Sequence, residues 1–190
     1  MCATPWKVGF LGSAFFLGWV VTILWVPGMS DKSGRKKFWI TGVAINLILY
    51  TMLMTCSSLN QMIFVLFAFG MNTSLRVNVG YIYLMELMPT KSHTMIGTVW
   101  NIGEACIYLI GTLYFWQVSK DWQHVVMLGY AMMLFSLLGS FALPESPRLL
   151  KELNRNDEAK LALDTIARWN KKHLSFYLND FPDLQSPAFD

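Results

Sequence analysis

The chain has 190 residues, of which 54% are hydrophobic and 14% are charged, with a net charge of +3 and a mean hydropathy of +0.40. Soluble domains carry about 25% charged residues, so this chain has too little polar surface to cover itself in water. The charges gather in residues 31–37 and after Arg148, beside apolar segments, which argues against a nucleic-acid-binding face.

The chain contains a series of apolar segments. Each is close in length to the roughly 20 residues that a helix needs to cross a bilayer. They cover residues 8–26, 38–56, 62–87, 95–116 and 125–143. Small residues recur four apart at Gly9/Ser13 and Ala14/Gly18, which allows a neighbouring helix to approach closely. Residues 1–7 have no basic region, and no cleavage site follows the first segment, so we expect a retained helix after a short extracytoplasmic stub.

The stretch from Pro27 to Lys37 separates the first two apolar segments. Its proline and glycine predict a turn, and its basic residues predict a cytoplasmic position. Alternation then places residues 57–61 and 117–123 outside, and residues 88–94 and everything from Arg148 onward inside. The N-terminus is therefore predicted to be extracytoplasmic and the C-terminus cytoplasmic, although Lys7 lies on the less usual side.

A cytoplasmic helical segment is predicted over residues 144–172, after the last apolar segment. Asn156 or Asp157 is the expected cap of an amphipathic helix that runs to about Lys172. Ala159, Leu163, Ile166 and Ala167 follow helical spacing on one face of this helix. Residues 173–190 contain prolines and aspartates and are predicted to be disordered.

Two charged residues, Arg76 and Glu104, lie deep in apolar segments. At a rise of about 1.5 Å per residue, they are about 18 Å and about 15 Å from the predicted cytoplasmic ends of consecutive, antiparallel helices. A central charge costs at least about 2.5 kcal/mol and marks a functional hypothesis. Two alternatives remain open, a structural ion pair between the helices and a lining of the substrate path.

Asparagines also interrupt the apolar segments, and they either line a cavity or bond a neighbouring helix. They are Asn46, Asn72, Asn78 and Asn101. The sequence has no nucleophile triad and no phosphate loop, and Cys2, Cys56 and Cys106 lack the number and spacing of a metal site. We therefore expect neither an enzyme nor a bound cofactor or metal.

Three motifs of the sequence are typical of one protein family. Asp31-Lys32-Ser33-Gly34-Arg35-Lys36 resembles the Asp-Arg/Lys-x-Gly-Arg-Arg/Lys signature between the second and third helices of the major facilitator superfamily of transporters, although Pro27 stands where the family's first glycine would be. Glu86-Leu-Met-Pro89 resembles the family's Glu-x-x-Pro-x-x-x-Arg, with His93 in place of the arginine. Pro144-Glu-Ser-Pro-Arg148 is similar to the segment after the sixth helix in sugar porters and organic cation/anion transporters.

The resemblance implies an all-α membrane protein with helices two to six of a twelve-helix fold, plus the intracellular helix. It implies a partial secondary transporter that moves a small organic solute by alternating access, and an organic ion is the favoured class of solute. Its partners would be the lipid bilayer, the solute, a coupling ion and a second helix bundle, with no nucleic acid. The alternatives are a truncated, non-transporting membrane protein and a sugar-porter-like carrier of a neutral solute.

The resemblance also implies a cytoplasmic gate, in which a salt-bridge network closes one side of the transporter and breaks during transport. The alternative without a functional role is a set of unrelated charges at one membrane face. The residues that match the motifs of this gate are Asp31, Lys32, Gly34, Arg35, Lys36, Glu86, Glu145 and Arg148.

Overall fold

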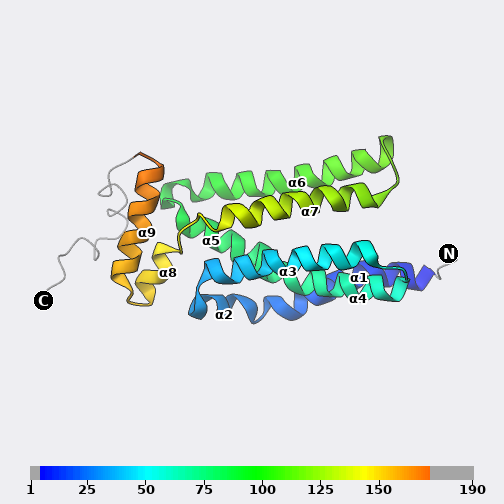
Figure 1. Ribbon diagram of the computed structural model, residues 1–190, viewed down its shortest axis with the longest axis horizontal. Coiled ribbons are helices and arrows are strands. Elements are labelled where there is room, and N and C mark those ends of the chain that lie inside the picture. The colour runs from blue at the N-terminus through cyan, green and yellow to red at the C-terminus, as the bar shows by residue number, and fades with distance from the viewer. Residues whose placement is uncertain (1–4, 172–190) are drawn as a thin grey trace, which may run out of the picture.

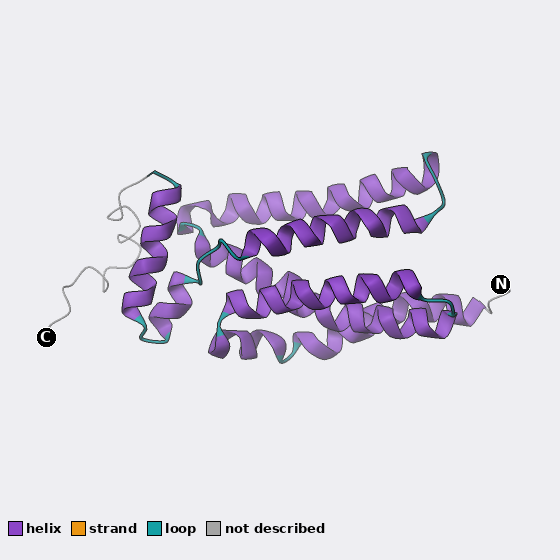
Figure 2. Ribbon diagram, viewed as in Figure 1, coloured by secondary structure: helices purple, strands orange, loops and turns teal. Residues whose placement is uncertain are grey.

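The computed structural model describes residues 5–171, and the regular structure within that range is helical throughout (Figure 2). Five stretches are long and apolar enough to cross a membrane, which confirms the predicted all-α membrane protein. They contain α1 (Pro5–Ile23), α3 (Arg35–Thr55), a composite helix (Leu59–Leu87), α6 (His93–Gln117) and α7 (Trp122–Ser140). The predicted stub is shorter than expected because α1 begins at Pro5. Cys2 and the predicted tail lie outside the described residues.

The composite helix contains a change of helix type in its middle. α4 (Leu59–Thr73) begins with a capping box between Ser58 and Gln61, and α5 (Val79–Leu87) forms the other end. Between them Ser74–Asn78 forms the π-helical turn η1, which carries Arg76 at its centre. π-helical turns inside α-helices are rare and are frequent at functional sites.

The predicted turn between the first two spans is confined to Gly34, because most of residues 27–37 belongs to the short helix α2 (Val26–Ser33) or to the start of α3. Pro27 lies in the first turn of α2, where its missing N–H would have had no helical partner. Gly34 is the single non-helical residue between α2 and α3. Its φ of +109° lies in a region that other residues rarely adopt.

The helices α1, α3 and α4 pack into one group, and α6 and α7 run alongside it (Figure 1). Two glycines explain the close approach of α1 and α4. A Cβ atom at Gly18 would overlap the Phe67 carbonyl, and one at Gly70 would overlap the Phe15 carbonyl. The small-residue spacing in the first apolar segment thus marks a true helix contact at Gly18, whereas Gly9 faces open space.

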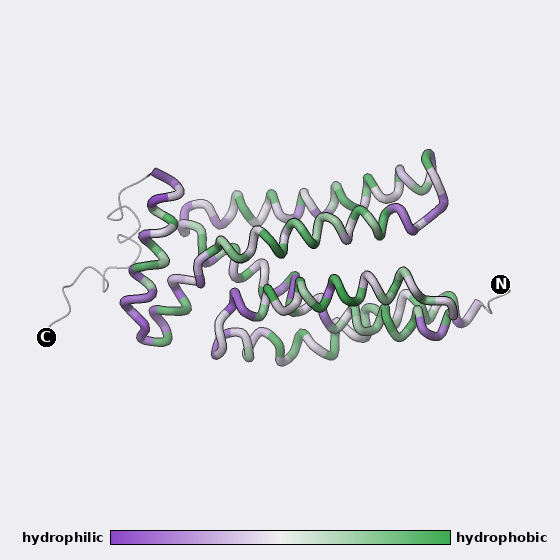
Figure 3. The backbone as a smooth tube through the Cα atoms, viewed as in Figure 1, coloured by the Kyte–Doolittle hydropathy of each residue, from purple (hydrophilic) through white to green (hydrophobic). Residues whose placement is uncertain are grey.

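Apolar side chains cover the outside of the bundle. α6 has no buried residue, and α7 has only Ser140 buried. Apolar residues extend along the spans, whereas polar ones gather at the turns and around α8 and α9 (Figure 3). Helices that expose apolar residues so widely are suited to a lipid environment.

Two helices lie across one end of the bundle, α8 (Pro147–Glu152) and α9 (Asn156–Trp169) (Figure 1). The predicted amphipathic helix is confirmed, since the buried face of α9 packs against Leu150 and Leu87. Its cap is Arg155, without a side-chain hydrogen bond, and not Asn156 or Asp157. We call this end the α9 end; the start of α1 and the α6–α7 turn lie at the opposite end. The buried face consists of Ala159, Ala162, Leu163, Ile166 and Ala167.

Candidate functional site

An ion-paired cluster lies at the α9 end, centred on Arg35, the first residue of α3. Its Nη2 is 3.1 Å from Asp31 Oδ1, and its Nη1 is 2.7 Å from Glu86 Oε1. The side chains of Arg35 and Glu86 are 10% and 12% exposed, whereas that of Asp31 is 51% exposed. The stronger tie is therefore the buried one, from the start of α3 to the last turn of α5.

The guanidinium of Arg35 is only partly satisfied. Its Nε and Nη1 are buried and make no hydrogen bond, so the 2.7 Å approach to Glu86 is an ion pair without hydrogen-bond alignment. Aligned, bidentate arginine–carboxylate pairs are the strong ones. The Arg35–Glu86 ion pair therefore lacks the hydrogen bonds that would fix it in one geometry, and the guanidinium can change partners.

Glu86 also holds the start of α8. The Ser146 hydroxyl donates to Glu86 Oε2 at 2.6 Å and accepts from the backbone N–H of Leu149 at 3.2 Å. Ser146 is fully buried and caps α8 immediately before Pro147. A serine followed by proline at a helix start is a recognisable capping pattern, but the bond to Glu86 depends on the packing of α5 against α8.

Glu145 ties the other side of the cluster together. Its Oε1 accepts from the backbone N–H groups of Lys36 at 2.9 Å and Ser146 at 3.1 Å. The Lys36 ammonium donates to the carbonyls of Phe141, at 3.3 Å, and Leu143. A Cβ at Gly34 would lie 3.0 Å from Glu145 Oε2, so the glycine also leaves room for this carboxylate.

The structure brings most of the predicted gate residues together, with two differences. Arg148 donates to Thr90 Oγ1 at 2.8 Å and pairs with no carboxylate of the described chain, so it is not part of the ion-pair network. Lys32 is exposed and likewise forms no ion pair within residues 5–171. The Tyr83 hydroxyl, which the sequence did not single out, donates to the Pro144 carbonyl.

Arg76 and Glu104 form no direct ion pair among those described for residues 5–171. They interact electrostatically over a longer distance, so the contact pair expected as one alternative is not made. Arg76 is half-buried on η1, and its buried Nε has no hydrogen-bond partner. Glu104 is exposed on α6. The arginine thus retains an unused donor in the middle of the span.

Two of the four asparagines are structural in this conformation. Asn72 Nδ2 donates to the Gly42 carbonyl at 2.8 Å and to Asn46 Oδ1 at 3.2 Å. Asn46 and Asn72 are 2% and 4% exposed, so of the two alternatives they follow the second: they join α3 to α4 and do not line an open path.

The other two asparagines bond only within their own helices. Asn78 donates to Ser74 Oγ at 3.2 Å inside η1, and Asn101 donates to the Gly97 carbonyl at 2.8 Å. Asn101 and Glu104 are exposed and three residues apart, so they share one face of α6. This face and η1 remain as the candidate polar surface inside the span.

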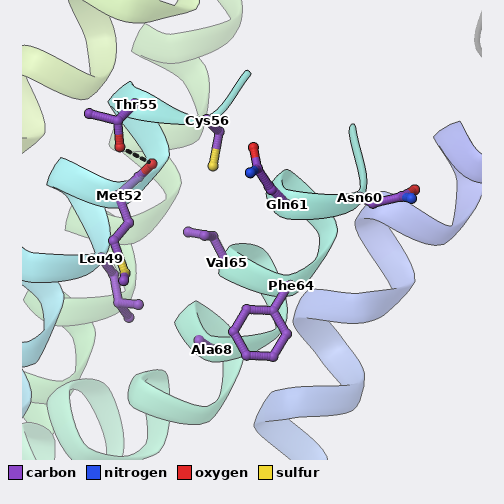
Figure 4. Close-up of a pocket in the computed structure, with 9 residues that line it drawn as sticks. All are labelled: Leu49, Met52, Thr55, Cys56, Asn60, Gln61, Phe64, Val65 and Ala68. Atoms are coloured by element: carbon purple, nitrogen blue, oxygen red, sulfur yellow. Dashed lines mark hydrogen bonds between the residues drawn. The ribbon is translucent and has the colours of Figure 1, made fainter. Parts of the chain in front are cut away.

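A cavity of about 510 Å³ lies between α3 and α4, near the turn that joins them (Figure 4). Leu49, Met52, Phe64 and Val65 give it apolar walls, and polar residues such as Gln61 lie at its edge. Its lining contains no charged residue, so Arg76 and Glu104 lie outside it. It therefore offers no charge with which to bind an ion.

The helix bundle, the ion-paired end and the apolar exterior define a polytopic α-helical membrane protein. Residues 3–180 match the model of the Major Facilitator Superfamily, and the chain belongs to this family of membrane transporters. The match confirms the resemblance to this superfamily that the three sequence motifs predicted.

Several curated proteins are similar to the chain. It is 25% identical to human solute carrier family 22 member 2, over 92% of this chain and 31% of the relative. It is 24% identical to rat synaptic vesicle glycoprotein 2B, over 90% and 27%, and 27% identical to the Escherichia coli putative metabolite transport protein YaaU, over 80% and 35%. The chain thus spans about a third of the length of the curated relatives it matches.

Proposed function

We propose that this chain forms part of one helix bundle of a secondary transporter, which moves a small organic ion by alternating access. In such transporters two bundles rock about a site near the middle of the membrane. A second bundle and a coupling ion are therefore part of the proposal. The observation that carries it is the buried Arg35–Glu86 pair, which joins α3 to α5 at one end of a bundle of the transporter family.

The proposed orientation has the α9 end in the cytoplasm. Support comes from the basic residues Lys32, Lys36 and Lys37, which flank the start of α3, and from the basic residues of α9. The N-terminus would then be extracytoplasmic. Reporter tags at both termini in intact cells test this orientation, and a cytoplasmic N-terminal tag would refute it.

The ion-paired cluster is proposed as the cytoplasmic gate. Asp31 is half-exposed, and such pairs contribute about 0–1 kcal/mol, so this arm can open at low cost. Arg35 keeps unused donors, which lets it exchange partners when α3 separates from α5. Ser146 and Glu145 would hold the linker after α7 against the closed gate.

The proposed solute path runs between η1 and the exposed face of α6. The unused Nε of Arg76 is available to an anionic group of the solute, whereas Glu104 and Asn101 supply an acid and an amide on the facing helix. Ionisable residues inside a membrane span commonly mark such paths. Lys32 and Arg148 remain in the proposal only as residues near the gate, and Asn78 as a second polar group of η1.

Uptake by cells that express the full-length protein tests this proposal, with panels of organic anions, organic cations and neutral sugars. We expect Arg76→Ala to abolish or redirect ion uptake while Arg76→Lys retains part of it, because the lysine keeps the charge. Glu104→Ala should alter the charge preference. Unchanged ion uptake by correctly inserted Arg76→Ala protein, or uptake of neutral sugars alone, would refute the ionic path.

A further inference from the structure

A cavity of about 190 Å³ lies at the α9 end, between the α2–α3 junction and the helices α8 and α9. It is smaller than the about 300–1,000 Å³ of pockets that enclose a drug-sized ligand, so it suits a small polar group. Its polar lining comes from Lys32, Lys37, Arg155, Glu145 and Glu158, and three leucines line it as well.

The charges that line this cavity are not balanced. Arg155 and Glu158 neutralise each other through two bonds, from Nε to Oε1 at 2.8 Å and from Nη2 to Oε2 at 2.6 Å. Glu145 accepts from two backbone N–H groups at Oε1, but its negative charge stays in the lining. The Lys32 and Lys37 ammonium groups have no ion pair or hydrogen bond in the described part of the chain. With Arg155 and Glu158 paired, two lysines and one carboxylate remain, and this net charge of +1 favours an anion in the cavity.

The depth of the cavity favours a lipid as the source of that anion. α3 has 21 residues, which is about 32 Å at about 1.5 Å per residue and matches the about 30 Å hydrocarbon core of a bilayer. Its first residue, Arg35, then lies at the membrane surface, where phospholipid phosphates are found. Lys32 and Lys37 flank this residue at the same level.

The leucines that line the cavity also favour a lipid as the source of the anion. Leu149 is buried, while Leu153 is 39% exposed, and both line the cavity beside the lysines. A free phosphate makes no use of an apolar wall, whereas the glycerol and the first acyl carbons of a phospholipid can pack on one. Basic pockets between membrane helices on the cytoplasmic side bind anionic headgroups.

We propose that this cavity binds the phosphate group of an anionic phospholipid from the adjacent leaflet, with Lys32 and Lys37 as its counter-charges. Residues of the α2–α3 junction and of α8 line the cavity, so a lipid bound there contacts both and holds the junction against α8. The effect on the gate rests on the proposed function, but the binding itself does not.

The experiment uses purified full-length protein in phosphatidylcholine nanodiscs with and without a minor fraction of phosphatidylserine. Native mass spectrometry measures the phosphatidylserine retained, and thermal unfolding measures its effect on Tm. We expect Lys32→Gln/Lys37→Gln to bind phosphatidylserine about tenfold more weakly, since each cation near an anionic surface contributes measurably. Lys32→Arg/Lys37→Arg should keep the binding, because the charge remains.

The matched control is Lys91→Gln/Lys160→Gln, which removes the same charge at the α9 end but away from the cavity. It should bind phosphatidylserine like the unmodified protein. Equal losses in both double variants, or no loss in either, would overturn the proposal. Inorganic phosphate in pure phosphatidylcholine nanodiscs should raise Tm very little. An equal, lysine-dependent rise in Tm with inorganic phosphate would show an anion site that needs no lipid, and would also overturn it.

Discussion

Arg35 Nη1 lies 2.7 Å from Glu86 Oε1, so the first residue of α3 contacts the last turn of α5 through two side chains that are nearly buried. Glu86 accepts a second bond from Ser146 at the start of α8. A single carboxylate therefore joins three segments at the α9 end. Changes at this carboxylate or its arginine should affect all three.

Arg35→Ala should destabilise the protein far more than Asp31→Asn does. Removing the arginine leaves Glu86 buried without its counter-charge, and breaking a buried pair costs about 3–5 kcal/mol. The Asp31 arm is half-exposed, so its loss should cost about 0–1 kcal/mol. Thermal unfolding of both variants in detergent measures the difference. Equal shifts in Tm would contradict the assignment of Glu86 as the main partner.

Asp31→Asn should nevertheless slow transport by the full-length protein more than it weakens solute binding. Asp31 lies near the end of α2, is half-exposed and pairs with Arg35, and it is not one of the polar residues of the proposed solute path. Its effect should fall on the movement between states. Binding to purified protein and initial uptake rates are compared. Lost binding together with a normal turnover of bound solute would rule out the gate.

Gly70→Ala should disrupt the packing of α1 against α4, whereas Gly12→Ala should not. The new methyl group at position 70 would overlap the Phe15 carbonyl, and overpacking costs about 1–3 kcal/mol or more. Gly12 has open space around it, so alanine there should be neutral or should favour the helix by up to about 1 kcal/mol. Folded yield and Tm report the outcome. A neutral Gly70→Ala variant would mean that α1 and α4 are further apart than described.

Asn72→Ala should lower the stability by about 1–3 kcal/mol, because the Gly42 carbonyl and Asn46 Oδ1 lose their shared donor in a buried site. Asn101→Ala is the control, since that side chain is exposed and bonds only its own helix. We expect a change within about 0.5 kcal/mol there. Thermal unfolding of both variants decides the matter. Similar losses would show that Asn72 has no special role between α3 and α4.

Arg76→Ala and Glu104→Ala should be close to additive in their effects on stability. The two side chains form no ion pair in the structure, so the coupling in a double-mutant cycle should stay below about 1 kcal/mol, against several for a buried contact pair. The four variants are compared by thermal unfolding. Restored stability in the double variant would show that the two charges meet directly in the membrane.

The sequence by itself determined the membrane spans within residues 5–171, the amphipathic face of α9 and the motifs that contain Gly34 and Glu86. Hydropathy over about 20 residues and apolar spacing within one helix are local properties, so they do not depend on what packs nearby. The predicted turn was too long for a local reason as well, because Pro27 and Gly28 are tolerated within a first helical turn and do not require a loop.

Only the tertiary structure decided which groups meet. Arg148 bonds Thr90 and not a carboxylate, Ser146 reaches Glu86, and Asn46 turns toward Asn72, all across separate helices. The π-helical turn at Arg76 lies where residues of η1 pack closely on Gly42 of α3, a contact that no local pattern contains. Hydrogen bonds and ion pairs are made over a few ångströms, so their partners depend on which helices pack together and in what register.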